Sequence, residues 1–163
     1  MNIIVKNKDT LIFDEFKFKC CVGKHGFTKN KCEGDKKTPK GIFKLGNIFF
    51  RKERVDLPIS KVKKIPIKKN MGWCDDSRSP KYNKLMKITK KIRHEKMFRN
   101  DTKYDYLIPI KYNTEKIIKN KGSAIFLHLT KDYKPTDGCI ALKKNDFLIL
   151  MKLINKKTRI KII

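Results

Sequence analysis

The segment from Ser123 to Leu142 constrains the fold of this chain more than any other part of it. An apolar run over residues 124–127 ends in His128, a short polar loop follows, and Gly138-Cys139 opens onto a second apolar run. Short apolar runs bounded by polar turns are typical of buried strands. A strand that ends in histidine, followed by a return through a Gly-Cys turn, brings a base next to a thiol. The pattern therefore predicts a cysteine nucleophile that performs acyl transfer.

The residue types in this segment fit the chemistry of a cysteine enzyme. A free thiol has a pKa of about 8.5, so little of it is thiolate at neutral pH unless a base takes its proton. We expect His128 to act as that base toward Cys139 and later as the acid toward the leaving amine. The backbone N–H groups of Gly138 and Cys139, with that of Asp137 as a further candidate, are expected to form an oxyanion hole.

A partner must also orient the imidazole of His128. The backbone carbonyl of the next residue, Leu129, is one candidate. The carboxylates of Asp132 and Asp137 are the others nearby, and the sequence leaves the choice between carbonyl and carboxylate open.

The length and composition predict one domain over residues 1–163 with a sizeable core. Hydrophobic residues make up 39% of the chain, which excludes a disordered polymer. No stretch approaches the roughly 20 apolar residues of a membrane span. The first residues lack the apolar core and cleavage site of a secretory signal, which leaves three alternatives: a cytoplasmic protein, export by a route that this sequence does not reveal, or a native start upstream of residue 1.

The formal net charge is +26, from 42 Lys and Arg residues against 16 Asp and Glu residues. Such a field attracts anionic polymers, so a basic polyanion-binding module is one interpretation. The positive charge comes mostly from Lys and is spread along the chain rather than gathered in one tail. We therefore expect no dedicated nucleic-acid partner. The same Lys-rich context predicts that His25 and His94 are exposed and have no catalytic role.

Five cysteines, at positions 20, 21, 32, 74 and 139, form no CxxC pair. A zinc site from Cys20, Cys21, Cys32 and His25 is conceivable, but its spacing does not match the common zinc knuckles. We expect no metal and no organic cofactor. Cys20 and Cys21 lie in a strand-like run and are expected to be buried. The odd count is compatible with a reactive thiol at Cys139, which we expect to be alkylated before the other four at pH 7.

Most of the chain has the pattern of strands separated by polar turns. Phe16, Phe18 and Cys20 alternate with lysines, which is the period-two signature of a half-buried strand. Extended segments are predicted over residues 2–6, 10–13, 16–22, 42–50, 104–112, 122–129 and 158–163. Pro109 favours an edge position or a bulge in its strand. Residues 23–40 and 71–83 have the composition of loops.

Two further segments have helical spacing. Apolar residues at 147, 148, 150, 151 and 154 form one stripe over residues 144–154, with Asn145 or Asp146 near the N-cap. A second helix is predicted over Lys84–Phe98 from the apolar residues at 85, 88, 92 and 97. Many strands with one or two helices predict a mainly β fold, either a sandwich or a barrel.

The site segment resembles the catalytic motif of L,D-transpeptidases of the YkuD type, the cysteine enzymes that cross-link peptidoglycan. That motif is a histidine on a strand, a loop, and then Ser/Thr-His-Gly-Cys; here it reads His128 and then Thr136-Asp137-Gly138-Cys139. The segment Thr38-Pro39-Lys40-Gly41-Ile42-Phe43, preceded by Glu33-Gly34-Asp35, is similar to the family's Thr-Pro-x-Gly-x-Phe stretch. Other segments look like a compact subgroup of the family: Gly72-Trp73-Cys74-Asp75-Asp76, Pro80-Lys81-Tyr82-Asn83, Tyr104-Asp105 and Tyr112-Asn113. The resemblance covers residues 16–163.

Two positions depart from the family pattern. Asp137 replaces the histidine that usually precedes Gly-Cys, which leaves His128 as the motif's base and puts a carboxylate beside the thiol. Ala141 stands where the family usually has Arg or Asn to hold a substrate carboxylate or main-chain group. Another cation, such as Arg78 or a lysine, is expected to serve instead. The loop between His128 and Cys139 is also shorter than usual in the family, which predicts an entrance to the active-site cleft of a different shape.

The resemblance implies ping-pong acyl transfer without a cofactor. Cys139 attacks an L,D-amide of a peptidoglycan stem peptide, His128 protonates the departing D-residue, and an amine or water resolves the thioester. An amine acceptor makes the protein an L,D-transpeptidase, and water makes it an L,D-carboxypeptidase or amide hydrolase on the same scaffold. No motif decides between these two outcomes.

The resemblance also implies substrate contacts and a location. The candidates for substrate binding are Thr136, Trp73, Tyr82, Asn83, Tyr112, Asn113 and Arg78, with core or rim packing as the competing interpretation for the aromatic residues.

Peptidoglycan is cross-linked outside the cytoplasm, so the implied location is the cell envelope or periplasm. We expect a monomer whose partners are peptidoglycan stem peptides.

Overall fold

Residues 2–163 are described by a computed structural model, and they form a mainly β protein, which confirms the predicted fold class. The strands are β1 (Asn2–Lys6), β2 (Thr10–Phe13), β3 (Phe16–Lys19), β4 (Phe27–Thr28), β5 (Thr38–Pro39), β6 (Gly41–Lys44), β7 (Ile48–Phe50), β8 (Lys64–Pro66), β9 (Met71–Cys74), β10 (Leu85–Lys87), β11 (His94–Lys96), β12 (Tyr106–Pro109), β13 (Phe126–Leu129), β14 (Ile140–Leu142) and β15 (Arg159–Ile162). The helix α1 spans Lys144–Leu153.

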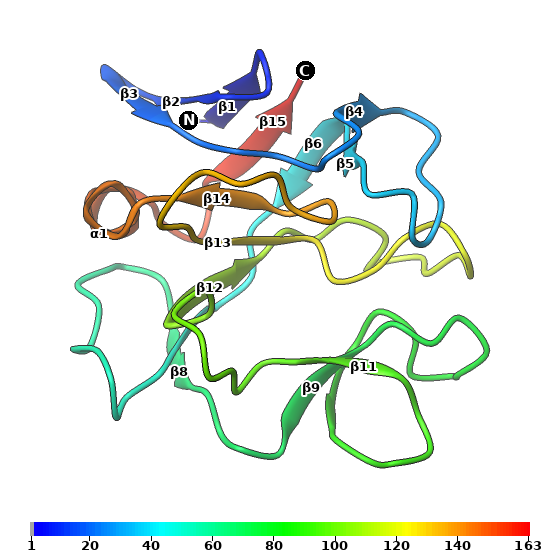
Figure 1. Cartoon of the computed structure of the whole chain (residues 1–163). Helices are drawn as coiled ribbons and strands as arrows, with labels where there is room; N and C mark the ends of the chain where they lie inside the picture. The colour runs from blue at the N-terminus through cyan, green and yellow to red at the C-terminus, as the bar shows by residue number, and fades with distance from the viewer. Residues whose placement is uncertain (1) are drawn as a thin grey trace.

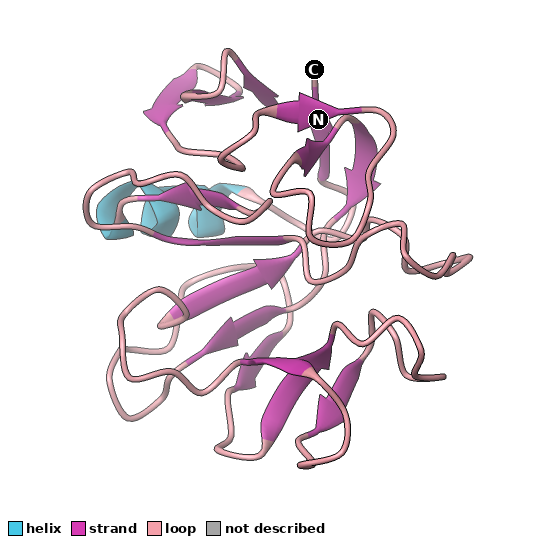
Figure 2. Ribbon diagram, turned by 45° about the vertical axis from the view of Figure 1, so that its right-hand side comes forward, coloured by secondary structure: helices cyan, strands magenta, loops and turns pink. Residues whose placement is uncertain are grey.

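The larger sheets lie in three layers (Figure 1). The upper sheet has the strand order β3-β2-β1-β15-β6, the central sheet β14-β13-β12-β7-β8, and the lower sheet β10-β9-β11. The helix α1 lies beside β14, between the level of the central sheet and that of the upper sheet (Figure 2). The central sheet is therefore covered on both of its faces.

The covering of both faces explains why the inner strands are apolar apart from His128. Every residue of β7, β12, β13 and β14 is buried, as expected for strands with both faces covered. Along β13 the side chains alternate between the two faces. Leu127 and Leu129 belong to the upper core, while Phe126 belongs to the lower one. By the same alternation His128 faces the lower side.

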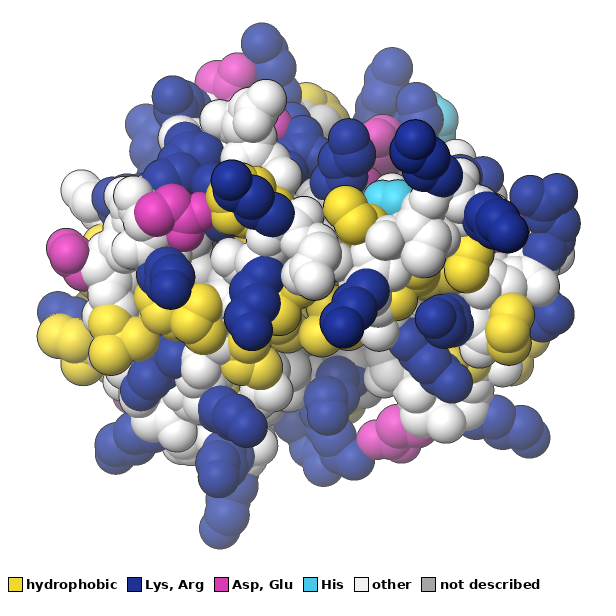
Figure 3. Space-filling view, turned by 90° about the horizontal axis from the view of Figure 1, so that it is seen from below, with side chains coloured by type: hydrophobic (Ala, Val, Ile, Leu, Met, Phe, Trp, Pro, Cys, Tyr) yellow, Lys and Arg dark blue, Asp and Glu magenta, His cyan; other side chains and the backbone are white. Residues whose placement is uncertain are grey.

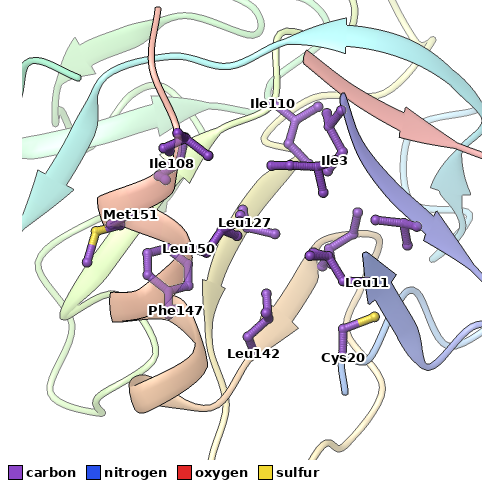
Figure 4. Packing of buried hydrophobic residues seen from close by; sticks show 14 of the residues in the cluster. Ile3, Leu11, Cys20, Ile108, Ile110, Leu127, Leu142, Phe147, Leu150 and Met151 are labelled. Carbon is purple, nitrogen blue, oxygen red and sulfur yellow. The ribbon is translucent and has the colours of Figure 1, made fainter. Parts of the chain in front are cut away.

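The upper core joins the helix to two sheets. Phe147, Leu150 and Met151 of α1 are fully buried, and they lie close to Leu127 and Ile108 of the central sheet (Figure 4). Residues from β1, β2 and β15 complete this cluster from above. Because the helix stripe meets the back of β13, it fixes the strand that carries His128.

The lower core is smaller and lies between the central and lower sheets. It contains Phe49, Ile67, Met97, Tyr104, Leu107 and Phe126, with Trp73 and Cys139 packed at its margin. The ring of Phe126 makes edge-to-face contacts with Trp73 at 5.3 Å and with Tyr104 at 5.8 Å between centroids. This packing builds an apolar wall next to the thiol.

The prediction of a helix over Lys84–Phe98 is wrong. The segment forms β10 and β11, which flank β9 on both sides in antiparallel pairing. Only Met86 of β10 is buried, and Leu85 is 42% exposed, so the local burial has period two. Pairing with β9, a strand outside this segment, overrides the segment's helical spacing.

Other predicted boundaries also move. Residues 42–50 are two strands rather than one, since β6 and β7 belong to different sheets and separate around Gly46, which packs against Pro109. Met71–Cys74, predicted as loop, is β9. Pro109 ends β12, where the ladder with β7 has already stopped. The helix is capped at Lys143 without a side-chain bond, and Asn145 and Asp146 lie in the first turn, near the N-cap as predicted.

Basic side chains are dispersed over the surface. The face seen from below carries Lys and Arg side chains across its whole width, interspersed with hydrophobic ones (Figure 3). Within residues 2–163, no helix has the length and apolar character needed to cross a bilayer.

We predict that Phe147→Ala destabilises the protein by about 3–5 kcal/mol, because it removes a fully buried ring and leaves a cavity behind β13. Urea unfolding measures this loss. Ile149→Ala on the exposed side of the same helix is the matched control, expected to cost about 1 kcal/mol or less. Equal losses for the two variants would contradict the packing of α1 on the central sheet.

Candidate active site

The register between β13 and β14 places Cys139 and His128 on the same face. The two strands are parallel, with Leu127 opposite Ile140 and His128 opposite Ala141. Since side chains alternate, Cys139 points to the side of Phe126 and His128. Cys139, His128 and Ala141 all line one pocket of about 570 Å³. The predicted base and thiol therefore share a cavity.

The imidazole of His128 is held by the backbone. Its Nδ1 lies 2.9 Å from the carbonyl oxygen of Leu129, which can only accept, so Nδ1 carries the proton and Nε2 keeps its lone pair. The ring of Tyr104 packs against it at 5.3 Å. Burial lowers the pKa of His128 to about 4, so the ring is neutral at pH 7. The predicted orienting role of the Leu129 carbonyl is confirmed.

The carboxylates offered as alternatives line the same pocket but pair with lysines instead of the ring. Asp137 is 85% exposed and its nearest cation is Lys36, at 3.8 Å. Asp132 pairs with Lys134 at 3.2 Å. Neither carboxylate is hydrogen-bonded to His128 within the described part of the chain, since the carbonyl next to the ring takes the Nδ1 proton first.

The thiol of Cys139 is held between two backbone groups. It donates to the carbonyl of Ala124 at 3.3 Å and accepts from the N–H of Phe126 at 3.3 Å. Burial of the sulfur raises the pKa of Cys139 to about 12, and the charges of Glu95 and Asp137 act in the same direction. The resting thiol is therefore protonated.

The loop before the thiol is a locked turn. Thr136 Oγ1 donates to the carbonyl of Cys139 at 2.6 Å and accepts from the N–H of Gly138 at 3.1 Å. Gly138 has φ +134°, and a Cβ there would come within 3.0 Å of the Lys37 carbonyl, so glycine is required. Thr38 Oγ1 donates to the Gly138 carbonyl at 2.9 Å.

This turn corrects the predicted oxyanion hole. The N–H of Gly138 is already donated to the hydroxyl of Thr136, so it is not free to bind an oxyanion. The N–H groups of Asp137 and Cys139 stay as the backbone candidates for this role. The role of Gly138 is to shape the turn that presents the thiol.

Asn83 supports the thiol from behind. Its Oδ1 accepts from Trp73 Nε1 at 2.9 Å and from the N–H of Ala124 at 3.1 Å, and its Nδ2 donates to the carbonyls of Tyr112 and Asn113 at 3.0 and 2.7 Å. The side chain is buried and every one of its donors and acceptors is used. Because Ala124 contacts the sulfur of Cys139, Asn83 positions that contact.

Most of the other residues predicted to bind substrate instead form hydrogen bonds that hold the chain segment leading into β13. The buried hydroxyl of Tyr82 donates to Glu33 and accepts from the N–H of Gly122. The hydroxyl of Tyr112 donates to the carbonyl of Lys121 at 2.5 Å, and Asn113 bonds the carbonyls of Ile118 and Gly122. In residues 2–163, the pocket lining includes Thr136 but not Tyr82, Tyr112 or Asn113.

The remaining two candidates also lie outside this pocket. Arg78 is 89% exposed and pairs with Asp76 at 3.2 Å. Trp73 and Asn83 line a second pocket, on the other side of the wall formed by the Trp73–Phe126 contact. The structure thus brings the predicted aromatic and amide residues together as a scaffold behind the thiol.

Several pocket residues were not predicted. Glu33 accepts hydrogen bonds from Tyr82 and from Ser123, at 2.7 Å for the latter. Glu95 and Arg99 also line the pocket. The resemblance of the segment around Glu33 to the family could have identified Glu33 as a site residue. Glu95 and Arg99 carried no signal, because Glu95 lies in the segment that had the spacing of a helix and Arg99 directly follows it.

The remaining cysteines and histidines are structural or exposed. Cys20 and Cys21 are buried, as predicted, and His25 is exposed, as predicted. His94 is half-buried and packs against Gly72, so the prediction that it is exposed is wrong. Residues 2–163 hold no cluster of three or more His, Cys, Asp or Glu side chains suited to a metal ion.

The fold and this pocket define a mainly β protein in which a cysteine and a histidine at the central sheet line one pocket. A family model for the YkuD L,D-transpeptidase catalytic domain matches residues 2–162. The chain belongs to this family, whose members are L,D-transpeptidase-type enzymes of peptidoglycan.

Solved structures show the same fold. The helical cell shape determining protein Pgp2 from Campylobacter jejuni matches with a TM-score of 0.53 and 18% sequence identity, covering 99% of this chain and 46% of that chain. A mutant of Pgp2 matches equally well. The chain thus spans about half the length of Pgp2, and at this identity the likeness shows the fold alone. A comparison with curated proteins finds no match.

The sequence predicts that Cys139 is alkylated first, but the burial of its thiol in the structure predicts a different order. Cys32 is exposed, whereas Cys139 is half-buried and its pKa is raised to about 12. We predict that iodoacetamide modifies Cys32 first at pH 7, and that the rate at Cys139 rises about tenfold per pH unit between pH 7 and 10, with its thiolate fraction. Peptide mapping by mass spectrometry measures both rates. Faster modification of Cys139 than of Cys32 at pH 7 would contradict the neutral thiol.

Proposed function

We propose that this chain is a cysteine acyltransferase that acts on peptidoglycan stem peptides as an L,D-transpeptidase. The observation that carries the proposal is the pocket shared by Cys139 and His128, with Nε2 of His128 left unprotonated by the bond from Nδ1 to Leu129. Membership of the YkuD family supplies the substrate class.

In the first step Cys139 attacks the carbonyl carbon of an L,D-amide. Both groups are neutral at rest, so Nε2 of His128 takes the thiol proton while the C–S bond forms. The carbonyl electrons move to its oxygen, and the N–H of Cys139 donates to this oxyanion. The thiol gives up its hydrogen bond to the Ala124 carbonyl in the same motion.

In the second step the tetrahedral intermediate collapses and the C–N bond breaks. The imidazolium of His128 returns its proton to the leaving amine of the D-residue, which leaves a thioester on Cys139. A low intrinsic pKa makes His128 a strong acid once charged, which favours this transfer. An amine of a second stem then attacks the thioester carbonyl, so that a C–N bond forms and the C–S bond breaks. The proton of the attacking amine passes through Nε2 of His128 to the departing sulfur, which restores the thiol and leaves a cross-link.

Hydrolysis of the same thioester is the close alternative, since water in place of the amine gives an L,D-carboxypeptidase with every residue in the same role.

We further propose that residues 1–163 form one catalytic domain that acts as a monomer in the cell envelope. The dispersed positive charge supports contact with anionic wall material but gives no second function.

We predict that purified protein converts a disaccharide tetrapeptide to dimers, and that Cys139→Ala abolishes all product. His128→Gln should slow product formation about 10²–10⁴-fold, because general acid–base catalysis is lost. Cys32→Ser is the matched control with unchanged activity. Chromatography with mass spectrometry separates dimers, which mean transfer, from tripeptide alone, which means hydrolysis. Full activity of Cys139→Ala would overturn the proposal.

A further inference from the structure

The second pocket lies between the central and lower sheets and has no role in the acyltransferase mechanism. Its volume is about 590 Å³, and within residues 2–163 it shares no lining residue with the catalytic pocket. Its walls come from β7, β8 and β12 of the central sheet and from β9 and β10 of the lower sheet. A pocket of this size holds a small ligand.

The floor of the second pocket is apolar and only partly covered by protein. Its hydrophobic residues are Leu45, Phe49, Val62, Ile65, Trp73, Leu85 and Pro109. Ile65 and Trp73 are half-buried, and Leu85 is 42% exposed. Leu85 stands opposite Trp73 in the pairing of β9 with β10, so the two side chains lie on one face of the lower sheet. Apolar surface left open inside a concave site is suited to an apolar ligand.

The charged groups around this floor are mostly of one sign. Four lysines line the second pocket: Lys63, Lys84, Lys111 and Lys156. All four are exposed, and within residues 2–163 none of them forms an ion pair. The carboxylate of Glu115, also in the lining, is held by Lys44 at 2.6 Å, which lowers its pKa. The second pocket therefore combines an apolar floor with a surplus of positive charge.

We propose that the second pocket binds a fatty-acid-type anion, whose hydrocarbon chain covers the floor while its acidic head group pairs with the lysines. An acidic peptide would also match the charge, but its backbone N–H and C=O groups would need hydrogen-bond partners. The apolar floor offers few, and the amide of Asn83 in the lining is already fully used. A hydrocarbon chain needs no such partners.

The test uses the single tryptophan of the chain, Trp73, which lines the second pocket. Its fluorescence is followed during titration with octanoate, octanol and decanoate, and calorimetry measures the same affinities. We expect octanoate to bind about tenfold more tightly than octanol, because only the acid pairs with the lysines. Decanoate should bind about tenfold more tightly than octanoate, because two more methylene groups leave water.

Two variants locate the site, each with a matched control. Replacing the four lysines of the second pocket by Gln should remove the preference for octanoate over octanol. A control with the same change in net charge should keep it, and it replaces four exposed lysines outside both pockets by Gln: Lys17, Lys29, Lys152 and Lys161. Leu85→Glu should abolish binding of all three probes, whereas Ile42→Glu, at a residue 55% exposed on β6, should leave it unchanged.

The proposal is overturned if neither fluorescence nor calorimetry detects decanoate binding, or if octanoate and octanol bind equally to the unaltered protein. Equal losses in the two four-lysine variants would also overturn it, since the acid would then follow net charge rather than this site. Because the substituted lysines are exposed, both four-lysine variants should unfold near the wild-type temperature, which a melting curve checks. None of these measurements needs turnover, so failure of the acyltransferase proposal leaves this one standing.

Discussion

The parallel register between β13 and β14 is the constraint on which the rest of the structure depends. It puts Cys139 and His128 on one face, and a slip of one residue would turn either side chain into the opposite core. The strand β14 and the turn before it are held by the amino-terminal part of the chain. The backbone of Cys21 pairs with that of Ala141, and Gly23 pairs with Thr136 in the turn before the thiol. The amino-terminal third of the chain thus holds the site in register.

The same burial that fixes the pair also sets its protonation. Desolvation raises the pKa of Cys139 and lowers that of His128, so both shifts favour the neutral thiol and the neutral ring. A resting thiolate–imidazolium pair is therefore not stored in the free protein. Proton transfer has to accompany attack, and a bound substrate with its oxyanion donor supplies the driving force.

How far the sequence could predict this site follows from how local each signal is. His128, Cys139 and the stripe of α1 lie within short periodic segments, and the carbonyl of Leu129 is adjacent to the ring it orients. Asn83 works through contacts with strands and loops distant in sequence, so its role as a brace could not be predicted. The segment around Glu95 and Arg99 had helical spacing, and its pairing with β9 only exists in the folded chain.

The most direct test of this account is a nitrogen NMR titration of His128, compared with His128→Gln for assignment. We expect a neutral ring at pH 7 with the proton on Nδ1, an unprotonated Nε2, and titration at a pH of about 4. Titration near the ordinary value of about 6.5 would contradict this, because the ring would then be solvated, and a proton on Nε2 would contradict it because that atom could not accept the thiol proton.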